Sequence, residues 1–217
     1  LAIATTILAV LLVAFRRASL RVERRDVPYF LLLGLLGVAA VQGSYFYTIS
    51  RLGVGLAILI QYLAPVLIVA FDLVRGRWVG WTMIAAVLCA LAGTALLVGN
   101  VNPGTLDASP LDWGIAFLSA FVFAFYIVAS KRGLARYRPE TVLLYTFAIA
   151  GLFWAFVNPP WVILKSGYDA QLWGMFLLLG LFSTLVPFAL FYMGLRRLPA
   201  AEASVIATTE PLVAMVL

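Results

Sequence analysis

One acidic residue lies deep inside an apolar segment near the end of the printed sequence. Glu210 is followed directly by Pro211 and is preceded by Thr208 and Thr209. The apolar segment starts near Pro199, so at 1.5 Å per helical residue Glu210 lies roughly 15 Å into a bilayer. A carboxylate at that depth costs several kcal/mol unless it is protonated, paired or in contact with water. We predict that Glu210 exchanges a proton during function; the alternative is that it satisfies backbone groups freed by Pro211.

Uncharged polar and aromatic side chains in other apolar segments are the second group of candidates. Gln42 and Gln61 are costly to expose to lipid, so both should face the protein interior, where they contact a ligand or hydrogen-bond to a neighbouring helix. Pro65 and Pro211 are expected to kink their helices, and paired interruptions of this kind indicate a carrier's binding site. The predicted substrate contacts are Gln42, Tyr45, Gln61, Tyr62, Tyr126, Thr208 and Thr209.

The composition indicates which elements must position these residues. The 217 residues are 65% hydrophobic and 11% charged, with a mean hydropathy of +1.07, far outside the range of soluble domains. Lipid-embedded backbone groups must be satisfied within the chain, and no segment alternates as a barrel strand would, so the predicted fold class is an all-α polytopic membrane helix bundle. The sequence predicts eight spans, at 1–15, 28–50, 53–73, 79–99, 111–130, 141–164, 172–195 and 200–217.

The residue types that usually hold metals are scarce. There is no His, and Cys89 has no second thiol, which excludes an internal disulfide and the usual zinc and haem ligand sets. No ATP-binding motif occurs either. We therefore expect no metal and no cofactor.

The positive charges are distributed unequally between alternate loops. Thirteen of the 15 Lys and Arg residues fall on one side of the predicted spans; only Arg51 and Lys165 fall on the other. The positive-inside rule places the basic side in the cytoplasm of a multi-pass protein of a prokaryotic cell membrane. The net charge of +6 thus belongs to short loops, and no nucleic-acid partner is expected.

An internal repeat runs through the sequence at an offset of 146 residues. Leu-Leu-Leu-Gly-Leu at 31–35 recurs at 177–181, Arg51 matches Arg197, and Pro65 matches Pro211. The predicted repeats are 1–99 and 111–217. Residues 31–50 run out of the cytoplasm whereas residues 177–195 run into it, so the copies are inverted, an arrangement suited to alternating access. Each copy would have five spans, which predicts ten in an intact chain, with an outer span absent at either end here.

The spacing of the repeated motif resembles that of a known family. The motif positions are Leu52-x4-Ala57-x7-Pro65, repeated as Leu198-x4-Ala203-x7-Pro211, with Glu210 before the second proline. The chain resembles the EamA-type members of the drug/metabolite transporter superfamily. The resemblance implies a ten-helix carrier that exports or exchanges small polar metabolites through a central cavity lined by both repeats. One departure is that Ala64 occupies the position matched by Glu210, so any role of that carboxylate is asymmetric.

These observations predict a secondary transporter for small polar metabolites, namely amino acids, sugars or their analogues. We expect it to work by alternating access, with export coupled to proton movement. The alternative function is a membrane-embedded enzyme acting on lipid or peptide. It is less favoured because the spans lack His, a Cys pair and an acidic cluster. The expected partners are a small-molecule substrate, the lipid bilayer and a second copy of the chain in a homodimer.

Overall fold

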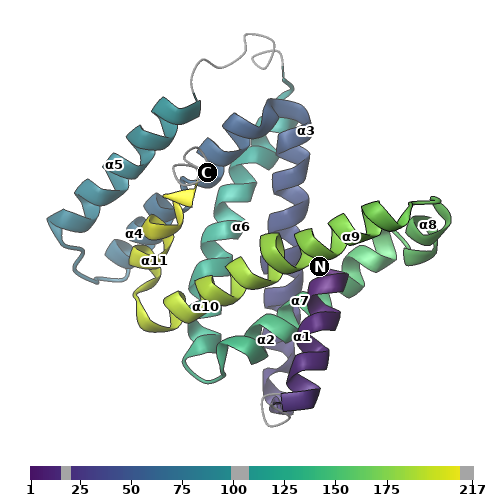
Figure 1. Cartoon of the computed structure of the whole chain (residues 1–217). Coiled ribbons are helices and arrows are strands. Elements are labelled where there is room, and N and C mark those ends of the chain that lie inside the picture. Colours follow the sequence, from purple (N-terminus) through teal and green to yellow (C-terminus); the bar gives the residue numbers. More distant parts are fainter. Residues whose placement is uncertain (16–20, 99–107, 211–217) are drawn as a thin grey trace. The chain divides into compact units, whose positions relative to one another are not determined.

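A computed structural model describes residues 1–15, 21–98 and 108–210 (Figure 1). Within these ranges every regular element is a helix, which confirms the predicted all-α fold class. The helices are α1 (Ala2–Phe15), η2 (Arg24–Asp26), α2 (Val27–Leu32), η3 (Leu33–Ala39), α3 (Ala40–Gln61), α4 (Ala64–Val74), α5 (Trp81–Val98), α6 (Pro110–Leu134), α7 (Pro139–Val157), α8 (Pro160–Lys165), α9 (Ala170–Leu178), η5 (Leu179–Leu185), α10 (Val186–Arg197) and α11 (Ala200–Ala207).

Four described helical segments are long and apolar enough to cross a membrane: Arg24–Val74, Pro110–Leu134, Pro139–Val157 and Ala170–Arg197. The apolar helices Ala2–Ala14 and Trp81–Leu96 are shorter. The first of the long segments carries both the second and the third predicted spans. A glycine marks the junction between those two spans, because Gly53 interrupts α3 with a φ of 81° and a ψ of 165°. A positive φ of this size favours glycine, which has no Cβ to clash with the backbone.

The predicted span 141–164 is divided in two. Helix α7 ends at Val157, Asn158 is extended, and the short helix α8 starts at Pro160. Pro159 lacks a backbone N–H and disfavours helical geometry in the residue before it, so Asn158 cannot continue the helix. The two consecutive prolines, Pro159 and Pro160, break the helix, which the hydropathy of the segment does not indicate.

A two-residue turn divides the predicted span 53–73. Helix α3 ends at Gln61, Tyr62 and Leu63 form the turn, and α4 begins at Ala64. At the matched positions α11 ends at Ala207, followed by the turn Thr208–Thr209. The helix is therefore interrupted at the same place in each sequence repeat.

The chain groups into two compact units, which we describe separately. One unit contains residues 1–39 and 129–197, and the other contains residues 40–128 and 198–217. In the first unit α1 packs against α7 and η5, α7 packs against η3, and α10 packs against α7 (Figure 1). In the second unit α4, α5 and α11 pack against one another and α5 also contacts α3.

Two π-helical turns in the first unit occupy matched positions. They are η3 (Leu33–Ala39) and η5 (Leu179–Leu185), and they are separated by the repeat offset of 146 residues. A π-helical turn widens the helix by one residue and is rare outside functional or strained sites. The sequence match at 31–35 and 177–181 therefore has a local structural counterpart.

The glycines of these π-helical turns make matched contacts across the first unit. A Cβ added to Gly34 would lie 2.6 Å from Ile149 Cβ, and a Cβ added to Gly180 would lie 2.7 Å from Ile3 Cγ2. Ile3 and Ile149 are themselves separated by 146 residues. Each glycine thus packs against the isoleucine of the other sequence repeat, the exchange of contacts that a local two-fold axis produces.

Candidate functional site

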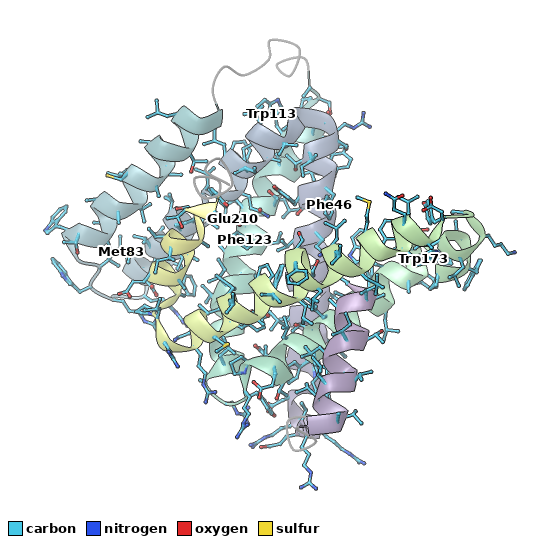
Figure 2. The ribbon with its side chains drawn as sticks, in the orientation of Figure 1. Phe46, Met83, Trp113, Phe123, Trp173 and Glu210 are labelled. Atoms are coloured by element: carbon cyan, nitrogen blue, oxygen red, sulfur yellow. The ribbon has the colours of Figure 1, made fainter. Side chains whose placement is uncertain are left out.

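One polar cluster of the second unit joins three residues that the sequence analysis predicted as functional. The Tyr62 hydroxyl and the Glu210 carboxylate lie close enough to interact electrostatically. Tyr45 lies close enough to interact electrostatically with both. Glu210 is exposed and follows the turn after α11 (Figure 2), so the cluster combines an accessible carboxylate with two phenols. Such a group can hold a proton or donate hydrogen bonds to a polar solute.

Packing between α3 and α6 supports the Tyr62 turn. Leu52, Leu56 and Ile60 of α3 form a buried apolar cluster with Ala116 of α6. The three α3 residues recur every four positions, a spacing that places side chains on one helix face. The turn therefore starts from a helix end that is fixed by apolar contacts.

The two predicted glutamines occupy different environments on α3. Gln61 is buried and directly precedes the Tyr62 turn. Gln42 is half-buried and lies three residues before Tyr45, so it shares a helix face with that tyrosine. Gln42 is therefore on the correct face for the cluster, while Gln61 is next to it along the chain.

The remaining predicted substrate contacts differ in how available their hydroxyls are. Tyr126 is buried in α6, and its ring stacks on Phe123 with centroids 6.2 Å apart. The Thr208 hydroxyl donates to the Val205 carbonyl at 2.7 Å, and the Thr209 hydroxyl donates to the Ile206 carbonyl at 2.8 Å. Both threonines still offer lone pairs, but their donor capacity is used by their own helix.

Of the two prolines predicted to kink their helices, Pro65 is within the described residues and lies at the start of α4. Pro65 lies in the first two positions of α4, where a missing N–H leaves no helical hydrogen bond unmade. The interruption falls two residues earlier, so Pro65 begins a helix that is already separate from α3. Pro211 lies outside the described residues.

A second polar cluster, missed from the sequence, surrounds the start of α6. Asp112 accepts hydrogen bonds from the Tyr47 hydroxyl at 2.8 Å and the Ser109 backbone N–H at 2.9 Å, and the Arg51 guanidinium is 3.7 Å away. The Ser109 hydroxyl accepts in turn from the Asp112 N–H at 3.2 Å. This reciprocal capping box was visible as Ser-Pro-Leu-Asp at 109–112.

A third cluster joins two basic loops in the first unit. The carboxylate of the buried residue Asp26 accepts a short hydrogen bond from the Tyr137 hydroxyl and pairs with Arg136 at 2.7 Å. The hydrogen bond from Tyr137, assisted by the positive charge of Arg136, holds the pKa of Asp26 below its ordinary value. Loss of hydration and then the bond to Asp26 raise the pKa of Tyr137. No local sequence pattern signals this cluster, because its members are more than 100 residues apart.

The family and relatives of the chain agree with this architecture. The profile of the EamA-like transporter family matches residues 1–99 and 113–217. The uncharacterized inner membrane transporter YicL of Salmonella typhimurium is 32% identical over 89% of this chain and 65% of its own length. The threonine/homoserine exporter RhtA of Escherichia coli K12 is 24% identical over 95% of this chain and 67% of its own length. The aromatic amino acid exporter YddG of Salmonella typhimurium is 29% identical over 56% of this chain and 45% of its own length.

A crystal structure supports the fold. It superposes with a TM-score of 0.74 at 24% identity and covers 96% of this chain and 71% of the solved chain. The chain spans 65% of YicL and less than half of YddG, so it matches part of the length of these relatives. The helical fold, the apolar helices and the two family matches lead to one identification: the chain is a membrane protein of the EamA-like transporter family, whose members are transporters rather than enzymes.

Proposed function

We propose that this protein is a secondary transporter that moves small polar metabolites across the cytoplasmic membrane by alternating access. Its two copies, 1–99 and 111–217, would be inverted repeats that exchange conformations around a shared axis. The single observation that carries the proposal is the exchange of contacts in the first unit, where Gly34 meets Ile149 and Gly180 meets Ile3.

This exchange of contacts is informative because few arrangements produce it. If the two copies were related by a simple translation, a contact made by a residue of copy one with copy two would not also be made by the matched residue of copy two with copy one. A two-fold axis exchanges the two copies, so each such contact occurs twice. The unequal distribution of Lys and Arg favours an axis in the membrane plane, which inverts one copy relative to the other.

Glu210 is our choice for the proton-coupling residue. A carboxylate at membrane depth is costly while charged, so binding and releasing a proton changes which environments it can occupy. Tyr62 and Tyr45 lie near it and can stabilise its charged form or contact a polar substrate. Their position next to the interrupted helices agrees with the tendency of carriers to bind substrate at discontinuous helices.

Amino acids are the substrates to test first. Two of the relatives are named as exporters, one for threonine and homoserine and one for aromatic amino acids. An amino acid carries an ammonium group and a carboxylate. The ammonium group complements the Glu210 carboxylate, and the carboxylate can accept hydrogen bonds from the tyrosine hydroxyls.

The test is transport by the purified protein in liposomes. Counterflow of labelled threonine, homoserine, phenylalanine or tyrosine would identify a substrate, and uptake driven by a pH gradient would show coupling. We expect Glu210→Gln to lower gradient-driven uptake at least tenfold while counterflow, which needs no net proton movement, persists.

Glu202→Gln is the matched control, because Glu202 belongs to the first turn of the same helix, α11. It should transport within about twofold of the unmodified protein. Normal gradient-driven uptake by Glu210→Gln from pH 5 to 8 would refute the coupling role. Hydrolysis of lipid or peptide with no solute flux would refute transport altogether.

A further inference from the structure

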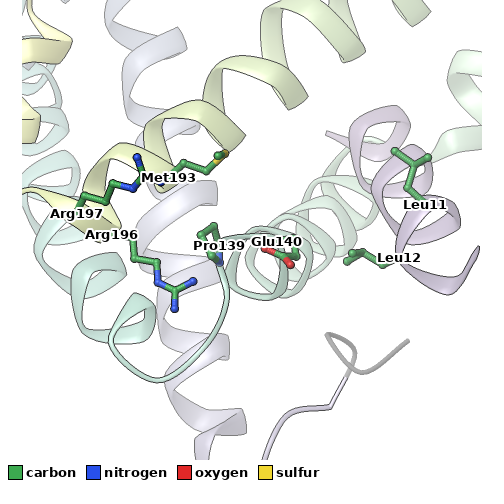
Figure 3. A pocket seen from close by; sticks show the side chains of 7 residues that line it. All are labelled: Leu11, Leu12, Pro139, Glu140, Met193, Arg196 and Arg197. Atoms are coloured by element: carbon green, nitrogen blue, oxygen red, sulfur yellow. The ribbon is translucent and has the colours of Figure 1, made fainter. Parts of the chain in front are cut away.

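A large cavity in the first unit is lined by no residue of the Glu210 cluster and has no role in the proposed function. It measures about 740 Å³ and is lined by Leu11, Leu12, Pro139, Glu140, Met193, Arg196 and Arg197 (Figure 3). Three helices build it: the end of α1, the start of α7 and the last turn of α10. All three helix ends adjoin loops on the predicted cytoplasmic side.

The lining of the cavity changes along α10 from apolar to positively charged. Met193 is 51% exposed and lies one turn before Arg196 and Arg197, the last residues of the helix. On α1, Leu11 is 46% exposed and lies near the end of an apolar segment. Apolar walls at membrane depth are thus followed by guanidinium groups at the membrane boundary.

The charges at the cavity favour an anion. Within the described residues, neither Arg196 nor Arg197 forms an ion pair, and both are exposed. Glu140, the one acidic lining residue, lies 3.8 Å from Arg138, so its charge is locally balanced. Helix α7 begins here with Pro139, has no side-chain cap, and adds the partial positive charge of its N-terminus.

We propose that this cavity binds an anionic phospholipid of the cytoplasmic leaflet. Arg196 and Arg197 hold the phosphate by paired N–H donors, and the acyl chains lie along Leu11, Leu12 and Met193. Arginine suits this role because its planar guanidinium can donate two parallel hydrogen bonds to one phosphate. Basic pockets between membrane helices on the cytoplasmic side bind lipid headgroups in this way.

The test measures lipid binding without any transport, so it is independent of the proposed function. Delipidated protein in a neutral detergent is titrated with phosphatidylglycerol or phosphatidylcholine, and bound lipid is counted by native mass spectrometry. We expect phosphatidylglycerol to bind at least tenfold more tightly than phosphatidylcholine. The double variant Arg196→Gln/Arg197→Gln should remove that preference.

Two further variants keep the test decisive if the double variant folds poorly. Met193→Trp leaves both arginines in place but fills the apolar wall, and should weaken phosphatidylglycerol binding about threefold or more. Arg75→Gln is the control. Arg75 is an exposed arginine of the second unit that lies over the Phe71 ring and does not line the cavity, so the change should leave binding within twofold.

Three outcomes would overturn the proposal. They are equal binding of the two lipids, unchanged binding by both the double variant and Met193→Trp, and full displacement of phosphatidylglycerol by millimolar inorganic phosphate or free amino acid. The last result would assign the cavity to a soluble anion or to a transport substrate.

Discussion

The two π-helical turns and the two interhelical turns form matched pairs, but only the first pair is chemically alike. At η3 and η5 the matched residues Gly34 and Gly180 make the same type of contact with matched isoleucines. At the interhelical turns the residue types differ: the repeat offset matches Tyr62, Leu63 and Ala64 with Thr208, Thr209 and Glu210. Packing preserves the symmetry of the repeat, while the polar side chains depart from it. Symmetry thus indicates the scaffold, and asymmetry indicates where to look for chemistry.

The largest expected effect tests the symmetric pair. Gly34→Ala and Gly180→Ala each place a Cβ within 2.7 Å of an isoleucine side chain, so neighbouring helices must move apart. Overpacking of this kind costs about 1–3 kcal/mol. We expect both variants to lower the Tm of the detergent-solubilised protein by similar amounts, measured by tryptophan fluorescence.

Gly174→Ala is the matched control in α9. A Cβ at Gly174 meets nothing within 4 Å, and alanine is favoured over glycine in a helix by up to about 1 kcal/mol. Its Tm should stay constant or rise. If one π-helical glycine tolerated alanine and the other did not, the two turns would not be equivalent.

The next effect tests the asymmetric pair. Tyr62→Phe removes the hydroxyl that interacts electrostatically with Glu210, the carboxylate to which we assign proton coupling. We expect gradient-driven transport to fall about tenfold. Thr208→Val, at the matched position, removes a hydroxyl that already bonds to the Val205 carbonyl, and should change transport less than threefold. The reverse order of effects would make Thr208, rather than Tyr62, the hydroxyl on which transport depends.

Much of the fold could be predicted from the sequence, because hydropathy directly reports burial in lipid. The apolar segments and the all-helical class followed from composition, and the Gly53 junction followed from the short loop assigned there. The π-helical turns could not be predicted, since a single extra residue per turn leaves no compositional mark. The break at Asn158 could have been predicted from the two prolines that follow it, Pro159 and Pro160.

The polar clusters show where sequence reasoning stops. Glu210 was predicted from the cost of a carboxylate at membrane depth, and Tyr45 and Tyr62 were predicted as substrate contacts. The structure brings the three close together in the second unit. Their proximity depends on how α11 packs against α4 and α5, which no local spacing determines. The Asp112 capping box was local and could have been found, whereas Asp26 and Tyr137 meet only through the tertiary fold.

A smaller effect concerns Lys131, a charged residue outside the Glu210 cluster. The Lys131 ammonium donates to the carbonyls of Leu195 and Arg196, at 2.8 and 3.0 Å, where α10 ends. A cation at a helix C-terminus stabilises it by about 1 kcal/mol or less. We expect Lys131→Met to lower Tm slightly and leave transport intact, with Lys165→Met as the control. A transport defect without a loss of Tm would make Lys131 functional.

The smallest effect concerns Asp26, which is matched by Leu172 at the repeat offset. Because Tyr137 and Arg136 lower its folded-state pKa, the carboxylate stabilises the protein above the unfolded pKa of about 3.9. That stability is lost as pH falls through the lower folded value, so the window lies below about pH 4.

Tyr137→Phe removes the main cause of this shift and should move the acid transition toward pH 4. The difference in Tm from the unmodified protein should be present at pH 7 and shrink as pH falls toward 3, with transport unchanged at neutral pH. A Tm difference that stays constant from pH 7 to 3 would mean that Tyr137 acts through its ring, which packs edge-on against Phe30, and not through the carboxylate. The asymmetry at Asp26 would then be a matter of packing, and the Glu210 cluster would stand apart as the asymmetric site in which a charge matters.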